Sequence, residues 1–150
     1  MSLLQRLKVA SGLKERRIEP KPRFTMIVVF YNMQREAERT LLSLSRAYQR
    51  EIDGIDYEVL CIDNGSSPAM ERESVEKFGP QFRLIRPEPA LPSACKAIND
   101  AAMEARGDYL GIMIDGAHIL SPGVLAQANE ALSGYPQAII GLRQWLDRKS

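Results

Sequence analysis

The chain has 150 residues, of which 45% are hydrophobic and 26% are charged, so it is long enough to bury a core and has the composition of a soluble globular domain. Its 20 basic and 19 acidic side chains nearly cancel, and no basic patch interleaved with aromatic residues occurs, which argues against a nucleic-acid partner. No apolar stretch reaches the roughly 20 residues that a membrane span needs, and no signal peptide is recognisable, so we expect a cytoplasmic protein.

The first 22 residues differ from the rest of the chain. Leucines at positions 3, 4 and 7 recur at helical spacing among basic side chains, and a proline-flanked linker follows. One interpretation is a surface helix that packs on the domain; the other is a basic amphipathic helix that contacts an anionic membrane surface through residues 1–17. We favour the first. The predicted organisation is this segment over 1–22, a domain over 23–142 and a polar tail over 143–150.

The first predicted strand is the almost unbroken apolar run Phe24–Phe30. Such a run suits a strand that is buried on both faces of a parallel sheet. A helix is predicted next, over Gln34–Glu51, because apolar side chains recur there at helical spacing. Asn32 lies just before this helix, and we expect it to cap the helix start.

The rest of the chain continues to alternate between strands and helices. The further predicted strands are Tyr57–Ile62, Phe82–Ile85, Asp108–Ile114 and Gln137–Gly141. The further predicted helices run from Ser67-Pro68 to Phe78, from Ser93 to Arg106, and from Ser121-Pro122 to Gly134. This alternation predicts an α/β domain of three layers, α/β/α, with a mostly parallel sheet and right-handed crossovers.

Polar groups follow three of the predicted strands, at Tyr31-Asn32, at Asp63–Ser66 and at Asp115–His118. The carboxyl ends of parallel strands share one edge of the sheet, and ligands of open α/β sheets bind beyond that edge. In the doubly wound order 3-2-1-4, the first and fourth strands are neighbours at the switch point. Any one polar strand end is ordinary turn chemistry, but three at one edge indicate a ligand site.

Several motifs that bind phosphate or carry catalysis are absent. The sequence has no glycine-rich dinucleotide fingerprint, no P-loop and no nucleophile elbow, so a nucleotide would be held by its base and ribose. Tyr31 can stack on a base, and the carboxylates of Asp63 and Asp115 can accept hydrogen bonds or ligate a divalent metal. No metal-type Cys/His spacing occurs, and we expect Cys61 and Cys95 to be small buried side chains without a disulfide.

Two stretches resemble family 2 glycosyltransferases of the GT-A fold. The stretch VVFYN…EAERTLLSLSRA…YEVLCIDNGSS resembles the start of that family. The stretch NDAAMEARGDYLGIMIDGAHILSPGVL resembles its helix, glycine, strand, acidic motif and proline. The resemblance covers about residues 24–141 and implies the GT-A (nucleotide-diphospho-sugar transferase) fold.

The resemblance also implies roles for individual residues. Residues after the first strand line the nucleotide site in that family, here Phe30, Tyr31, Asn32 and Glu36. The acid that ends the second strand, here Asp63, contacts the base, and a basic residue on the following long helix approaches the diphosphate. Lys96 is the candidate for that basic residue. The acidic D-x-D motif after the fourth strand, here beginning at Asp115, holds ribose and metal.

The chain departs from the family pattern in two ways. The second acid of the D-x-D motif is Ala117, so a dependence on Mg²⁺ or Mn²⁺ rests on Asp115, with His118 as a substitute ligand or as an ordinary loop histidine. The chain also ends soon after the predicted fifth strand, whereas a complete GT-A enzyme continues into an acceptor half that supplies the general base. We therefore expect an apparently truncated GT-A domain.

The resemblance implies that the domain binds a nucleoside-diphosphate sugar, UDP-linked, for transfer of the sugar to an acceptor hydroxyl. The acceptor and the catalytic residues are not assigned, and activity of this short chain alone is in question. The alternative is a non-catalytic nucleotide-binding or protein-interaction domain that keeps the fold. A truncated sheet edge or an exposed acceptor-side face would favour a homodimer.

Overall fold

The structure is a computed structural model that describes residues 21–114 and 118–143. The predictions for the N-terminal helix, for Asp115 and Ala117, and for the polar tail beyond residue 143 lie outside the described residues. None of the helices in the described ranges has the length and apolar character that crossing a membrane requires.

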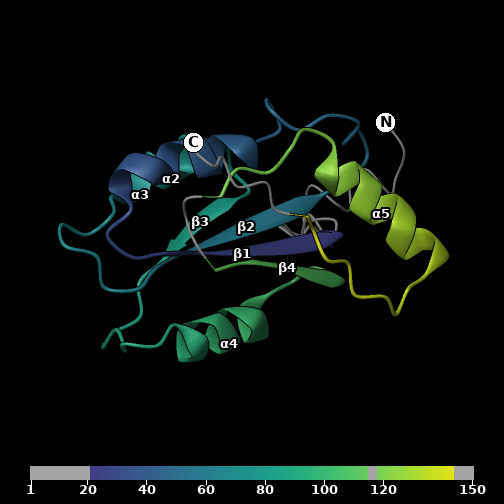
Figure 1. Cartoon of the computed structure of the whole chain (residues 1–150). Helices are drawn as coiled ribbons and strands as arrows, with labels where there is room; N and C mark the ends of the chain where they lie inside the picture. The colour runs from purple at the N-terminus through teal and green to yellow at the C-terminus, as the bar shows by residue number, and fades with distance from the viewer. Residues whose placement is uncertain (1–20, 115–117, 144–150) are drawn as a thin grey trace, which may run out of the picture.

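Four parallel strands form the sheet, in the order β3-β2-β1-β4 (Figure 1). They are β1 (Phe24–Phe30), β2 (Tyr57–Asp63), β3 (Phe82–Ile85) and β4 (Tyr109–Met113). Every residue of β1 and β2 is buried, as their apolar composition predicts for central strands. The predicted order 3-2-1-4 is therefore confirmed.

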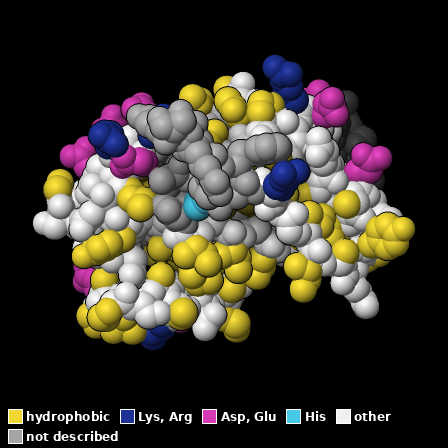
Figure 2. Space-filling view, viewed as in Figure 1, with side chains coloured by type: hydrophobic (Ala, Val, Ile, Leu, Met, Phe, Trp, Pro, Cys, Tyr) yellow, Lys and Arg dark blue, Asp and Glu magenta, His cyan; other side chains and the backbone are white. Residues whose placement is uncertain are grey.

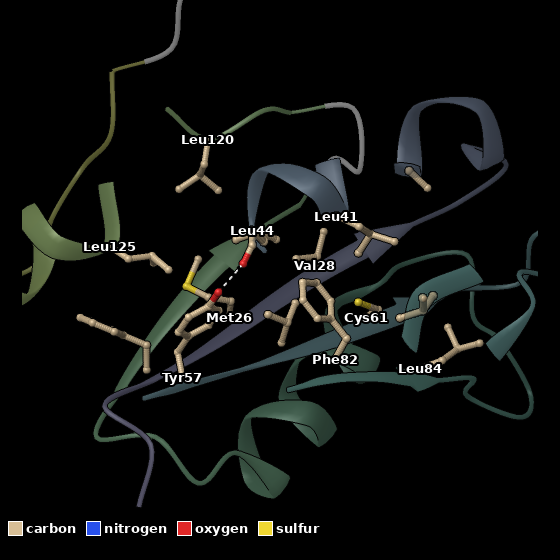
Figure 3. Packing of buried hydrophobic residues seen from close by; sticks show 14 of the residues in the cluster. Met26, Val28, Leu41, Leu44, Tyr57, Cys61, Phe82, Leu84, Leu120 and Leu125 are labelled. Carbon is tan, nitrogen blue, oxygen red and sulfur yellow. Dashed lines mark hydrogen bonds between the residues drawn. The ribbon is translucent and has the colours of Figure 1, made fainter. Parts of the chain in front are cut away.

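Helices lie on both faces of this sheet, and the predicted three-layer α/β/α fold is confirmed (Figure 1). The helices are α2 (Gln34–Ser43), α3 (Arg72–Glu76), α4 (Cys95–Glu104) and α5 (Val124–Gly134). Alternate residues of β1 point to opposite faces, so Met26 and Val28 join the core with α2 and α5, whereas Ile27 and Val29 pack with α4. Figure 3 shows the larger core, where the Tyr57 hydroxyl donates to the Leu44 carbonyl at 2.7 Å.

The prediction of a buried Cys95 is wrong, and the packing of α4 on the smaller core explains why. Ala97 and Ala101 form the buried stripe of this helix, and their small side chains let it approach the sheet. Cys95 precedes Ala97 by two positions, which is roughly half a helical turn, so it lies on the exposed side. Cys61 is buried as predicted, and both thiols are free.

The helix α2 ends at Ser43, eight residues before the predicted end. The hydroxyls of Ser43 and Ser45 donate to the carbonyls of Thr40 and Leu42, three residues earlier, at 2.7 Å each. Serine hydroxyls that bond the nearby backbone compete with helix continuation. The last turn is tighter than an α-helical turn. The Leu44 amide donates to the Leu41 carbonyl, three residues back, rather than to the carbonyl four residues back.

The predicted fifth strand at Gln137–Gly141 is wrong. The described residues 138–143 carry no strand, and the Ala138 amide donates to the Tyr135 carbonyl within a turn. Ile139 is 99% exposed, so this apolar segment has no sheet to pack on. Strand-forming side chains become a strand only where a neighbouring strand accepts their backbone hydrogen bonds.

At the amino end of the sheet, a buried carboxylate joins three elements. Glu58 of β2 accepts from the Thr25 hydroxyl at 2.7 Å and from the amide and Nε of Arg106 at 2.7 and 2.9 Å. Burial alone would raise the pKa of Glu58, but the hydrogen bonds and the positive charge of Arg106 together lower it below the ordinary value of 4.5. Glu58 thus connects β1, β2 and the turn between α4 and β4.

We expect Glu58→Gln to lower the free energy of unfolding by about 2 kcal/mol at pH 7, the usual contribution of hydrogen bonds to a charged group. Because the folded-state pKa is lowered, the carboxylate stabilises the fold above pH 4.5, and this contribution is lost as the pH falls through the folded-state value. Urea unfolding at pH 7 and pH 3 should therefore show a difference between the two proteins that shrinks at low pH. Glu38→Gln, at an exposed ion pair with Lys77, is the control and should change stability little.

Candidate functional site

A cavity of about 600 Å³ lies at the carboxyl edge of the sheet. Residues from three strand ends and from the loop before α4 line it, among them Val29, Tyr31, Asn64, Gly65, Leu91 and Ile114. This is the edge at which the sequence predicts a ligand site. The side chains around the cavity are mostly apolar, with few polar groups, as is usual for small-molecule sites.

Asn32 joins the loops that follow β1 and β2. Its backbone amide donates to the Ser66 hydroxyl at 2.9 Å, and its side-chain oxygen accepts from the Ser67 amide at 2.8 Å. The predicted role as a helix cap is wrong, because α2 begins after Met33 and no side chain caps it. Asn32 has a positive φ of 54°, which asparagine tolerates better than most residues.

Asp63 is buried at the end of β2 and organises the loop that follows. One carboxylate oxygen accepts from the Ser66 amide at 3.0 Å, and the other accepts from the Met70 amide at 2.8 Å. Arg86 Nε lies 3.5 Å from the second oxygen. These bonds hold residues 64–70 as a loop, so α3 starts at Arg72 rather than at the predicted Ser67-Pro68.

Asn64 is the residue of this site that the sequence analysis missed. Its backbone amide donates to the Phe30 carbonyl at 2.9 Å, and its Nδ2 donates to the Leu91 carbonyl at 3.0 Å. Its Oδ1 is buried and has no hydrogen-bond partner, alone among the buried side-chain polar atoms of the described residues. The available signal was its position directly after Asp63, at a predicted strand end.

Among the other predicted nucleotide-binding residues in the described part of the chain, Tyr31 lines the cavity, whereas Phe30, Glu36 and Lys96 do not. Tyr31 is 60% exposed and lines the cavity, whereas the side chain of Phe30 is fully buried in the larger core. Glu36 lies on α2, outside the cavity lining, and pairs with Arg35 at 2.8 Å. Lys96 is exposed on the first turn of α4 and pairs with Asp100, one turn along the helix.

The predicted metal ligands cannot be assembled from the described residues. Asp115 lies outside them, and His118 is half-buried in the segment that resumes after it. Within residues 21–114 and 118–143, no three His, Cys, Asp or Glu side chains come together as a metal site would require. Mg²⁺ and Mn²⁺ bind through several oxygen ligands, so His118 by itself does not make such a site.

Comparison with known proteins gives a family match and a fold match. A family model described as "Glycosyl transferase family 2" matches residues 25–145. A crystal structure of S. aureus TarS 1-349 superposes with a TM-score of 0.65 and 20% identity, covering 81% of this chain and 38% of that one. A second S. aureus TarS structure gives a TM-score of 0.64 and 20% identity, over 85% of this chain and 24% of that one. No curated protein matches the chain significantly.

At this identity the solved structures establish the fold, which is that of GT-A glycosyltransferases. The chain spans about 38% of the length of TarS 1-349, so the two share one domain-sized region. The matched region includes β1 through α5 and therefore all of the strands around the cavity.

Proposed function

This chain belongs to glycosyl transferase family 2, and from that premise we propose that the cavity binds the nucleoside diphosphate of a UDP-linked sugar donor. The observation that carries the proposal is the unpartnered, buried Oδ1 of Asn64, a residue that lines the same cavity as the exposed Tyr31. In the intact enzyme the sugar passes to an acceptor hydroxyl.

Asn64 supports recognition of a uracil base. Its Nδ2 is already committed to the Leu91 carbonyl, so its free Oδ1 is an acceptor with a fixed orientation. The opposite amide orientation would place two oxygens against each other, since a carbonyl accepts and cannot donate. Uracil has an imide N–H to offer to this oxygen, whereas the corresponding nitrogen of cytosine is an acceptor and would be repelled.

Reaching this oxygen requires a small movement of the cavity wall. Oδ1 is covered in this structure, and the neighbouring wall is formed by Ala90 and Leu91, both of which are exposed residues of a loop. A buried acceptor without a partner destabilises the protein by about 1–3 kcal/mol. A ligand N–H that reaches Oδ1 removes this penalty, so the protein gains from the movement.

Tyr31 supports stacking on the same base. Its ring is 60% exposed at the cavity, next to the loop that Asn32 holds against the end of β2. Stacking of a base on an aromatic ring contributes about 1–3 kcal/mol. In the proposal, Asp63 holds the loop rather than touching the base, and the predicted roles of Lys96 and Asp115 toward the diphosphate, the ribose and any divalent metal are retained.

Calorimetry tests the site. We expect the chain to bind UDP and UDP-sugars, with Mn²⁺ compared against no metal. We expect Tyr31→Ala to weaken binding by about fivefold to a hundredfold because the stacking surface is lost. Tyr135→Ala is the matched control, because Tyr135 is 74% exposed and lies at the end of α5, outside the cavity lining. Equal affinities of the two variants, or no binding by the parent chain, would contradict the proposal.

The alternative, a domain that binds the nucleotide without catalysis, predicts a different pair of results. Such a domain binds UDP in the same cavity but neither transfers nor hydrolyses the sugar. Product analysis of a UDP-sugar incubated with the chain therefore separates the two functions. Hydrolysis that disappears in Tyr31→Ala would favour the enzyme.

A further inference from the structure

One proline-rich loop forms the wall of the cavity next to Asn64. This loop, which we call the strap (residues 87–92), runs from the end of β3 to the start of α4 (Figure 1). Pro87 is partly buried, and the other five residues of the strap are exposed. Figure 2 shows hydrophobic side chains facing solvent at the lower left, where Figure 1 places the connection between β3 and α4. A loop with so little buried apolar surface belongs to the parts of a fold that open most easily.

The strap has few hydrogen bonds to the rest of the domain. Three of its six residues are prolines, which have no N–H to donate. In the described part of the chain, its only hydrogen bond to a residue outside it is the one that the Leu91 carbonyl accepts from Asn64 Nδ2 at 3.0 Å. Prolines also restrict the backbone and make a segment stiff. The strap can therefore move as a unit.

Both ends of the strap are fixed. Before it, β3 ends at Ile85, and Arg86 Nε lies 3.5 Å from the buried carboxylate of Asp63. After it, the Ile98 amide donates to the Ala94 carbonyl at 2.9 Å in the first turn of α4. A change of backbone angles near these two points would move the strap without disturbing the sheet, as in loops that close over ligand sites.

In the middle of the strap, Ala90 lies against the loop that follows β2. A Cβ added to Gly65 would lie 2.9 Å from the Ala90 Cβ, so the two loops approach closely only because residue 65 is a glycine. Gly65 also has a φ of +88°, which favours glycine. Gly65 directly follows Asn64, and all three residues line the cavity. The contact between the loops therefore lies next to the buried Oδ1 of Asn64.

We propose that the strap is a lid that covers Asn64 Oδ1 in the empty protein and opens when a nucleotide base binds. This inference rests on the proposed function, because the nucleotide is the ligand that opens the lid. The bond between Asn64 and the Leu91 carbonyl is the pivot, which keeps the orientation of Oδ1, and Ala90 moves away from Gly65.

The free oxygen of Asn64 gives the nucleotide its preference for the open state. In the closed state this buried acceptor has no partner, which is unfavourable. In the open state the imide N–H of the base becomes its partner. A ligand shifts a conformational equilibrium only through such a difference in affinity for the two states. Because only the open fraction binds, the apparent dissociation constant equals the intrinsic one divided by that fraction, and a strap held closed should bind UDP weakly.

Distances between spin labels test whether the strap moves. Cysteines replace two exposed residues, Glu88 of the strap and Ser133 of α5, in a Cys95→Ser background, and the fully buried Cys61 stays unlabelled. We expect UDP to shift the distance between the labels. The control pair, Asp53→Cys with Ser133→Cys, leaves the strap unlabelled and should keep its distance. If calorimetry shows UDP binding and the strap label does not move, the lid is overturned and the nucleotide site stands; if UDP does not bind, both proposals fail.

A reversible lock tests whether the movement controls binding. The variant Gly65→Cys with Ala90→Cys, again with Cys95→Ser, places two thiols at the contact between the loops. A disulfide needs Cβ atoms roughly 3.5–4.5 Å apart, so it would hold the strap close to its closed position. We expect the oxidised protein to bind UDP about tenfold more weakly, or worse, than the same protein after reduction.

The lock has two controls. Strain from replacing Gly65 is present in both redox states, and Gly65→Cys alone cannot form the bond, so oxidation should leave its affinity for UDP unchanged. Circular dichroism should show that the oxidised and reduced forms are equally folded. Equal affinities of the two forms would overturn the lid. If the double variant does not fold, the spin labels, which leave Gly65 and Ala90 in place, decide the question.

Discussion

Gly107→Ala is expected to lower the free energy of unfolding by about 3 kcal/mol, the upper part of the range for overpacking a well-filled site. Gly107 lies in the turn between α4 and β4, and an added Cβ would lie 2.4 Å from the Thr25 amide nitrogen and 2.5 Å from the Phe24 carbonyl carbon. These are backbone atoms of the central strand and cannot move without disturbing the pairing of β1 with both neighbours. The Gly107 amide also donates to the Thr25 hydroxyl at 2.9 Å, a bond that any displacement would break.

Two other glycines supply the comparison. Gly134, the last residue of α5, has nothing within 4 Å of an added Cβ, so Gly134→Ala should leave stability unchanged or raise it slightly. Gly111→Ala meets the Met26 side chain at 2.3 Å, and a flexible thioether can move aside, so the loss should be smaller than at Gly107. Urea unfolding of the three variants measures the series. A Gly107→Ala protein as stable as the parent would show that the turn is not constrained by β1.

The four strands of the sheet were predictable because a short apolar run in the local sequence marks each of them. The bounds of β1 and β3 match the predictions residue for residue, and β2 differs by one residue. A buried parallel strand is a short apolar run between polar groups, and that pattern does not depend on distant partners. The strand order also followed from general rules for parallel crossovers.

The loop structure depends on partners that are far away in the sequence, so it could not be predicted. Asn32 bonds to Ser66 and Ser67, more than 30 residues later, instead of capping the next helix. The strand predicted at Gln137–Gly141 has the right composition but no neighbouring strand in the described structure. In both cases the local propensity was identified correctly. The outcome depended on a long-range contact, which Asn32 makes and which the segment Gln137–Gly141 lacks in the described structure.

In the candidate site too, the local sequence was enough to identify some residues, and long-range contacts decided the role of others. Tyr31 was identified from its place at the end of β1, and it lines the cavity. The choice between Asp63 and Asn64 was not accessible, because it depends on where the amides of Ser66 and Met70 and the carbonyl of Leu91 lie. The two amides satisfy both carboxylate oxygens of Asp63, whereas the Leu91 carbonyl engages only the Nδ2 of Asn64 and leaves its Oδ1 without a partner.

Asn64→Leu is expected to weaken UDP binding by about tenfold to a hundredfold while leaving stability nearly unchanged. The substitution keeps the size of the side chain but removes the acceptor, so the imide N–H of a bound base would be left without a partner. In the unliganded protein the same change removes a buried oxygen that has no partner, and this gain offsets the lost bond to the Leu91 carbonyl. Calorimetry with UDP measures the loss of affinity of this variant, and urea unfolding of the same variant measures its stability.

The base preference separates recognition from a general disturbance of the cavity. The parent should bind UDP more tightly than CDP, because Oδ1 attracts the uracil imide and repels the lone pair at the same position of cytosine. In Asn64→Leu this preference should disappear, since a leucine interacts equally with both bases. A preference for UDP that persists in Asn64→Leu would mean that another group reads the base and that the free oxygen of Asn64 has no part in recognition.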